Sequence, residues 1–224
     1  FPIAFPEVFE GDTGGFDVLI GNPPWEKTQV ERHEFWGRYN PGLRGVSQKE
    51  REQIMDRMEQ QRPDLAAEFE QQKEAEDKRG KFLANGPYPG IGKYHLDLYK
   101  AFCWRFWNLM ATDGYTGVVL PRSAFVGPGM EDFRVEVLDN GTITDLTFLK
   151  NKGGWVFDGV EPRYTVALFG IKKSVESADD LPLRGPYSDV QSYQQGVSSE
   201  APRFPVKKAK GWAGSATVPM LPTD

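Results

Sequence analysis

The sequence predicts an α/β protein whose sheet is mostly parallel, with an antiparallel pair of strands at one edge and a helical insertion. Short apolar runs alternate with helical patterns from residue 97 onward, which is typical of parallel strands joined by crossover helices. The last two predicted strands follow each other without a helix, so we expect them to pair antiparallel at an edge. A charged stretch, residues 26–95, separates the first strand from the others and is the expected insertion.

The composition is that of a globular protein and excludes several functional classes. Hydrophobic residues make up 39% and charged residues 26% of the 224 residues. The net charge of −5 gives no global basic field, although a local basic groove is compatible with it. The single cysteine, Cys103, excludes an intrachain disulfide framework and favours a reducing, cytoplasmic compartment. No apolar run approaches the ~20 residues of a membrane helix, so we expect no membrane partner.

The first predicted element is a short buried strand with the sequence "FDVLI", residues 16–20, which is almost continuously apolar and is bounded by Gly21. Residues 1–15 carry prolines and the glycine-rich "GDTGG" and are expected to form a loop. Pro23 and Pro24 end the strand because proline lacks the N–H group that a sheet requires.

The insertion, residues 26–95, is predicted to contain two helices. Ser47 with Glu50 three residues later forms a capping-box pattern that marks a helix start. Pro63 ends this helix, and a second one is expected from Pro63 to about Arg79. Apolar positions are few, which predicts a thin buried stripe and a wide charged face. Two interpretations remain open, namely a solvated surface excursion and an arm that contacts DNA or a partner.

The remaining core elements alternate between helix and strand. The first helix is expected to have Asp97 as its N-cap and Gly114 as its stop signal. Asn140 and Gly141 form the stop signal of the next helix. The predicted order is helix 97–110, strand 115–120, helix 130–141, strand 143–149, loop 150–163 and strand 164–171.

Residues 174–224 differ in composition from the preceding residues and are expected to be a linker or the start of another module. They are rich in Pro, Ser, Gly and Gln and show no strong period. Four basic residues form a small cluster that is either solvated or a phosphate-binding strip: Arg203, Lys207, Lys208 and Lys210.

The stretch "NPPW", residues 22–25, follows the first strand at a position where open α/β sheets bind ligands. It is consistent with a merely rigid turn, because Asn-Pro is common in turns. It is also consistent with a binding site. The Asn22 amide and the Pro23 carbonyl, held by fixed proline dihedrals, would form a pair of acceptors for an NH2 group. Trp25 adds a flat face on which a base stacks with about 1–3 kcal/mol.

Three ordered segments resemble the gamma-type adenine-N6 DNA methyltransferases, which include fused restriction–modification proteins and methylases of BREX- or DISARM-like phage-defence systems. The segments are "FPEVF…GGFDVLIGNPPWEK", "DLYKAF…LMATDGYTGVVLP" and "ITDLTFLKNKGGWVFDGVEPRYTVALFGI". The resemblance covers about residues 1–173. It implies a Rossmann-like, S-adenosylmethionine-dependent methyltransferase sheet that acts on a flipped-out adenine in double-stranded DNA.

The resemblance also implies roles for the motif residues. Asn22 and the Pro23 carbonyl would accept hydrogen bonds from the adenine amino group, with Pro24 as part of the rigid motif. Trp25 would stack on the base, and Phe157 in "WVFDG" would pack on its other side. Trp155 competes for this second role, and Phe157 could instead be a core or loop-anchoring residue.

Further residues would line the site without a named role. The helix around Leu98 and Tyr99 and the strand "GVVLP", residues 117–121, would line the pocket and the edge of the cofactor.

The family's glycine-rich cofactor motif has no good counterpart in this sequence. "GDTGG" has no strand before it, and the prolines of "GPYPGIG" disrupt a strand-to-helix turn. We therefore expect the C-terminal part of an incomplete methyltransferase domain, inactive alone, in which Asn22 and Pro23 contact S-adenosylmethionine only weakly. The missing N-terminal half or other subunits of a defence complex would supply the rest. Residues 174–224 would be a linker or the start of a target-recognition region.

Other functions share the same acceptor pair. A glutamine amide is also a planar NH2 donor, an RNA adenine is a possible substrate, and a non-catalytic piece that binds DNA or a partner would also lack the cofactor motif. The only histidines are His33 and His95, which together with one cysteine suggest no metal site.

Overall fold

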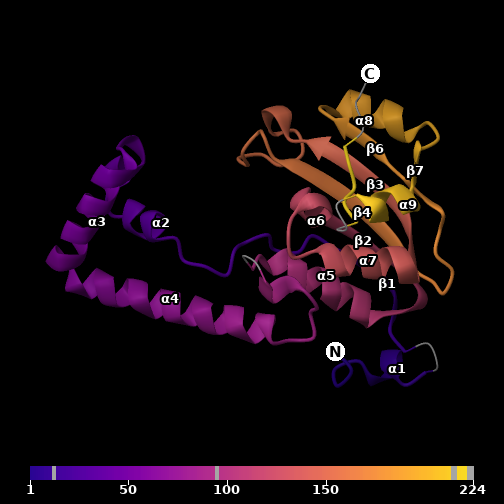
Figure 1. Ribbon diagram of the computed structural model, residues 1–224, viewed down its shortest axis with the longest axis horizontal. Coiled ribbons are helices and arrows are strands. Elements are labelled where there is room, and N and C mark those ends of the chain that lie inside the picture. Colours follow the sequence, from indigo (N-terminus) through magenta and orange to yellow (C-terminus); the bar gives the residue numbers. More distant parts are fainter. Residues whose placement is uncertain (12–13, 94–95, 213–215, 221–224) are drawn as a thin grey trace.

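The computed structural model describes residues 1–11, 14–93, 96–212 and 216–220. Figure 1 shows an α/β body and a helical arm that projects from it. The strands are β1 (Phe16–Gly21), β2 (Met110–Pro121), β3 (Gly141–Lys150), β4 (Thr165–Lys173), β5 (Asp180–Pro182), β6 (Arg184–Tyr187) and β7 (Arg203–Pro205). The α-helices are α1 (Pro6–Phe9), α2 (Arg32–Gly37), α3 (Gln48–Gln61), α4 (Pro63–Ala84), α5 (Leu98–Leu109), α6 (Ser123–Val126), α7 (Glu131–Asn140), α8 (Val190–Val197) and α9 (Val206–Gly211). Three 3-10 turns are η1 (Pro41–Gly45), η2 (Ile91–Lys93) and η3 (Lys152–Gly154).

The main sheet has five strands in the order β1-β2-β4-β3-β6. The pairs β1–β2 and β3–β6 are parallel, whereas β4 runs antiparallel to both β2 and β3. The predicted α/β class with a mostly parallel sheet is confirmed, and so is the antiparallel pairing of the last two predicted strands. The position of that pair at an edge is wrong, because β4 inserts between β2 and β3, and β6 adds outside β3.

The core lies between the sheet and the helices α5, α6 and α7, which cover one face of it (Figure 1). Helix α5 supplies much of this contact through Tyr99, Ala101, Cys103, Trp104 and Trp107. Trp104 meets Phe133 of α7 edge to face, with ring centroids 5.3 Å apart. Trp107 is buried, and its indole N–H donates to Glu136 at 3.1 Å, so the large ring is packed with its polar atom bonded.

Strand β1 is not buried on both faces, contrary to the prediction from its apolar run. Leu19 packs against the core, whereas Val18 and Ile20 are 59% and 85% exposed. Successive side chains of a strand point to opposite faces, so Val18 and Ile20 lie on the face away from α5. An apolar run alone does not tell whether both faces of a strand are covered.

Gly114 lies inside β2 and does not stop α5, which ends at Leu109. A Cβ atom at this position would lie 2.8 Å from the carbonyl oxygen of Phe16, so glycine allows the backbones of β1 and β2 to approach closely. Asp113 beside it has a positive φ of 64°, and the β1–β2 register shifts between Phe16 and Val18. The glycine therefore belongs to an irregular strand pairing, which its place in the sequence does not distinguish from a helix stop.

Residues 174–224, expected to be a linker or a new module, fold onto the body in their described part. β6 extends the main sheet, and β5 pairs with β7. Leu181, Leu183 and Phe204 join the main core. Within the basic cluster, Arg203 pairs with Asp180 and Lys210 with Asp139, which leaves less free charge for a phosphate-binding strip.

The arm consists of α2, η1, α3 and α4 and has a core of its own. The Ser47 hydroxyl accepts from the Glu50 N–H at 3.3 Å, as the predicted helix start requires, and α4 begins at Pro63. Helix α4 buries only Leu65 and Phe69, which confirms the predicted thin stripe, but it continues past Arg79 to Ala84. The arm core is formed by Phe35, Trp36, Leu43, Met55, Leu65 and Phe69.

The two ends of the arm are fastened to each other at its base. Lys27 and Asp97 form an antiparallel bridge. The Thr28 N–H donates to the Leu96 carbonyl and the Leu98 N–H to the Glu26 carbonyl, each at 2.9 Å. The insertion therefore leaves and rejoins the body at one point. No helix of the described residues is long and apolar enough to cross a membrane, and His95 lies outside those residues.

Candidate active site

A cavity of about 610 Å³ lies where the ends of β1 and β2, the start of α5 and the loop after β3 meet. Because β1 and β2 are parallel, their carboxyl ends reach the same edge of the sheet, the usual ligand position in open α/β folds. The NPPW motif follows β1, and Pro121 ends β2. The lining residues are Asn22, Pro23, Pro24, Trp25, Lys27, Asp97, Tyr99, Pro121, Ser123, Phe157, Val160 and Tyr164.

Both Asn22 and Pro23 of the motif line this cavity. Pro23 is buried, while Asn22 before it is exposed. Among the described residues, neither the Asn22 side chain nor the Pro23 carbonyl has a hydrogen-bond partner. The prolines fix the backbone of the motif, so the position of the Pro23 carbonyl is set by the chain itself. In a purely structural turn these polar groups would be expected to have hydrogen-bond partners within the protein.

The aromatic residues of the cavity meet at right angles. The rings of Trp25 and Phe157 are 6.0 Å apart between centroids and inclined at 84°. Trp155, the competing aromatic, does not line the cavity; its indole N–H donates to the Lys150 carbonyl at 2.6 Å, and its ring contacts Tyr193. The Trp25 indole N–H is buried and has no partner within the described residues. Two perpendicular aromatic rings, those of Trp25 and Phe157, therefore border the cavity.

The loop that carries Phe157 is held by one completely buried side chain, that of Asn151. Its Oδ1 atom accepts from the N–H groups of Val156 and Phe157 at 3.1 and 2.9 Å. Its Nδ2 atom donates to the carbonyls of Phe157 and Val160 at 3.0 and 3.2 Å. The amide thus uses both of its polar atoms to fix the backbone on either side of Phe157.

The floor of the cavity comes from α5 and α6. The Tyr99 hydroxyl lies 3.0 Å from the Ser123 hydroxyl. Burial raises the pKa of Tyr99 above its usual range, so the phenol stays protonated and remains a hydrogen-bond donor. Asp97 occupies the predicted N-cap position, but its side chain makes no capping bond; its carboxylate lies 3.4 Å from the buried Lys100 Nζ atom.

The sequence predicts part of this lining and misses the rest. The motif, Phe157, Tyr99 and Pro121 were expected at the site, and all of them line the cavity; Leu98 and residues 117–120, also expected there, are not among its lining residues. Lys27 and Asp97 were missed as lining residues. The signal for them is that they flank the insertion, because a compact insertion must leave and rejoin the body at neighbouring positions. The other missed residues are Ser123, Val160 and Tyr164.

Comparisons with known proteins show which solved structures share the fold of this chain. No protein-family model and no curated protein matches the sequence. A solved structure described as a modification subunit of a type I restriction enzyme from Vibrio vulnificus YJ016 superposes with a TM-score of 0.52 at 13% identity, over 92% of this chain and 37% of that one. The chain shares that subunit's fold. It spans little more than a third of the subunit's length. A structure of a type I restriction–modification system gives a TM-score of 0.49 at 12% identity, with the same shares of the two chains covered.

The described residues suit a planar amine-bearing ring better than they suit S-adenosylmethionine. Two free acceptors and an aromatic face match such a ring. None of the described parallel strands leads through a glycine-rich turn into an α-helix: Gly153 and Gly154 follow β3 but lead into the loop around Phe157. "GPYPGIG" forms a loop over residues 86–90 and the start of η2, and "GDTGG" includes residues 12–13, which lie outside the described part.

Proposed function

We propose that the chain is the target-base part of an S-adenosylmethionine-dependent DNA methyltransferase that modifies the N6 amino group of a flipped-out adenine in a restriction–modification or phage-defence system. The observation that carries the proposal is the cavity at the carboxyl ends of β1 and β2, in which the free acceptors of Asn22 and Pro23 adjoin Trp25 and Phe157. The fold shared with a restriction-enzyme modification subunit supports the same function.

In this proposal the chain's residues act on the target amine. The adenine amino group donates its two hydrogens to the Asn22 side-chain oxygen and the Pro23 carbonyl, which raises electron density on the nitrogen. Trp25 stacks on the base, and Phe157 limits its movement with its ring edge. These contacts offset the few kcal/mol that flipping a base costs. No general base is required, because the amine loses its proton after it has gained the methyl group.

S-adenosylmethionine would supply an electrophilic methyl group. Its cradle is not formed by the described residues, so we assign it to another polypeptide segment or subunit, with Asn22 and Pro23 making only weak contacts to it. We accordingly expect this chain by itself to bind the cofactor weakly and to be inactive.

The test is methyl transfer to adenine-containing duplex DNA by the full-length or partner-complemented protein, followed by detection of N6-methyladenine. Asn22→Ala removes one of the two acceptors, and we expect about a hundredfold loss or more, as for removal of one preorganised polar group in other active sites. Asn85→Ala is the matched control, since Asn85 lies at the end of α4, outside the cavity lining. Methylation that survives Asn22→Ala would refute the assignment.

A non-catalytic DNA- or partner-binding role is the second candidate, and it is favoured because the described residues form no cofactor cradle. DNA binding with no methyl transfer in any complemented mixture would identify that role. The acceptor pair also suits RNA adenine or a glutamine amide, and a methyl group recovered on either of these would replace DNA as the substrate.

A further inference from the structure

The arm is a separately packed helical unit that is anchored at the edge of the cavity. Its core of six buried residues joins α2, η1, α3 and α4, so its end is held in place by packing. Arg32 reinforces this core from outside, because its guanidinium bonds the carboxylates of Glu52, Asp56 and Glu59 at 2.7–2.8 Å. The bridge between Lys27 and Asp97 anchors the arm, and both residues line the cavity. The residues that anchor the arm to the body are therefore also residues of the candidate site.

Charge is distributed unevenly along the arm. Residues 35–49 carry three basic residues and no acidic one, although acidic residues are numerous in α3 and α4. We call Arg38, Tyr39 and Arg44 the arm tip. All three are exposed. Within the described part of the chain neither arginine has an ion-pair partner; Arg38 lies over the Phe35 ring at 5.9 Å.

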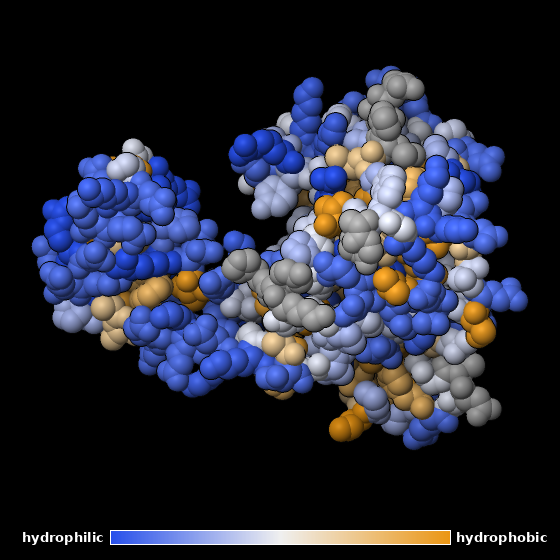
Figure 2. Space-filling view, viewed as in Figure 1, coloured by the Kyte–Doolittle hydropathy of each residue, from blue (hydrophilic) through white to orange (hydrophobic). Residues whose placement is uncertain are grey.

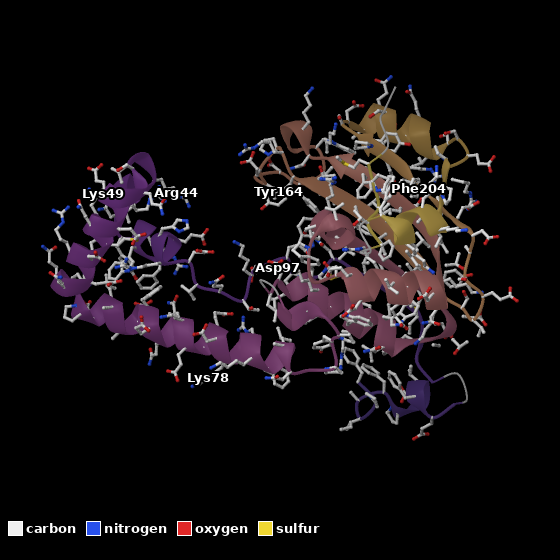
Figure 3. The ribbon with its side chains drawn as sticks, viewed as in Figure 1. Arg44, Lys49, Lys78, Asp97, Tyr164 and Phe204 are labelled. Carbon is white, nitrogen blue, oxygen red and sulfur yellow. The ribbon has the colours of Figure 1, made fainter. Side chains whose placement is uncertain are left out.

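Arg44 of the arm tip stands across an open gap from the body (Figure 3). Figure 2 shows a largely hydrophilic arm separated from the upper body by open space. Figure 3 shows Arg44 on the side of the arm that faces Tyr164 across this gap, with Asp97 at its base, whereas Lys78 of α4 points away. Because Tyr164 and Asp97 both line the cavity, the cavity and Arg44 border the same space.

We infer that the arm tip binds the phosphate backbone of the DNA duplex whose flipped base enters the cavity. The planar guanidinium of arginine matches the geometry of a phosphate group. Two arginines without ion-pair partners, in a packed segment that has no acidic residue, are therefore suited to bind a polyanion. Tyr39, an exposed residue beside Arg38, would add a neutral hydroxyl contact to phosphate of the kind common at DNA interfaces. The contact positions the duplex without reading its sequence. The inference rests on the proposed function, since it takes its ligand from it.

The test measures the affinity of the whole chain for a fluorescein-labelled DNA duplex by anisotropy over a range of salt concentrations. The variant is Arg38→Gln/Arg44→Gln. Each lost phosphate contact flattens the slope of log affinity against log salt by about 0.9, so we expect a change of about 2 and an equal weakening for all duplex sequences. Thermal unfolding of the variant should match that of the wild-type chain, because both side chains are exposed.

The matched control is Lys73→Gln/Lys78→Gln, which removes the same charge from α4, where both lysines pair with glutamates of the same helix. We expect its salt slope to equal that of the wild-type chain. An unchanged slope in the arginine variant, an equal flattening in the control, or a loss confined to duplex RNA would overturn the inference. If the arginine variant flattens the slope while no mixture methylates DNA, the arm inference stands and the proposed function fails. If methylation occurs and the slope is unchanged, only the arm inference fails.

Discussion

Asn151 shows how one residue organises the candidate site without touching a substrate. It is completely buried, and its amide bonds two N–H groups and two carbonyls of the loop that presents Phe157. An apolar replacement leaves these backbone groups without partners in a place that water does not easily reach, and each such group costs about 1–3 kcal/mol.

Asn151→Leu keeps the size of the side chain and removes all four bonds. We expect it to lower the free energy of unfolding by about 3 kcal/mol, measured by urea denaturation. It should also make the loop around Phe157 susceptible to limited proteolysis. Asn85→Leu is the control, because the exposed Asn85 makes one side-chain bond, to the Lys81 carbonyl. Equal losses in the two variants would show that the Asn151 bonds do not hold the loop.

At this scale the motif residues are predictable and the supporting residues are not. Asn22 to Trp25 form a local pattern at the end of a strand, and such a pattern can be read along the chain. Asn151 follows a strand just as Asn22 does, yet its bonds depend on how thirteen further loop residues fold back before β4. The resemblance predicted Phe157 at the site, but its perpendicular contact with Trp25 depends on that same loop.

The arm is the element whose independence from the body can be measured. Its core has no member in common with the core beneath the sheet. Local stability in proteins varies between such units, so damage to one core need not loosen the other.

Trp36→Ala removes the largest fully buried side chain of the arm. Such truncations lower the free energy of unfolding by about 3–5 kcal/mol. We expect faster amide hydrogen exchange throughout α2, α3 and α4, with unchanged protection in β2, β3 and β4. Phe82→Ala on α4 is the control, since Phe82 is 76% exposed and its exchange pattern should not change. Faster exchange across the sheet in Trp36→Ala would mean that arm and body unfold together.

Helix starts in the chain are predicted well because their signals are local. Ser47 caps α3, and Pro63 opens α4, as expected. Gly114 was misassigned because its purpose is a close approach to Phe16, nearly a hundred positions earlier in the chain. The sequence shows that a glycine is present but not which distant backbone requires it.

At the scale of the whole molecule, one face of the sheet is packed and the other is open at β1. Val18 and Ile20 lie exposed there with Tyr115 of β2, which pairs with Val18. Strand β1 also ends the described sheet, so its outer backbone groups are unpaired. Exposed apolar side chains on an edge strand favour association with another chain.

We expect the chain to self-associate with rising concentration and Ile20→Lys to reduce this, as measured by size-exclusion chromatography with light scattering. A charge on an edge strand opposes pairing with another strand. Val175→Lys serves as the control, because Val175 is 91% exposed outside the sheet. A wild-type chain that remains monomeric at all concentrations, or equal effects of both lysines, would contradict this view of β1.

The insertion of β4 between β2 and β3 sets the order in which the molecule can be made. β2 and β3 do not pair with each other; each pairs with β4 along most of its length. While the chain emerges from the ribosome, β2 and β3 therefore cannot join in one sheet until residues 165–173 have been synthesised. The arm, whose contacts are nearer in sequence, can form long before this. Synthesis thus allows the arm to form before the cavity, because the loop that carries Phe157 lies between β3 and β4 and closes only when β4 pairs.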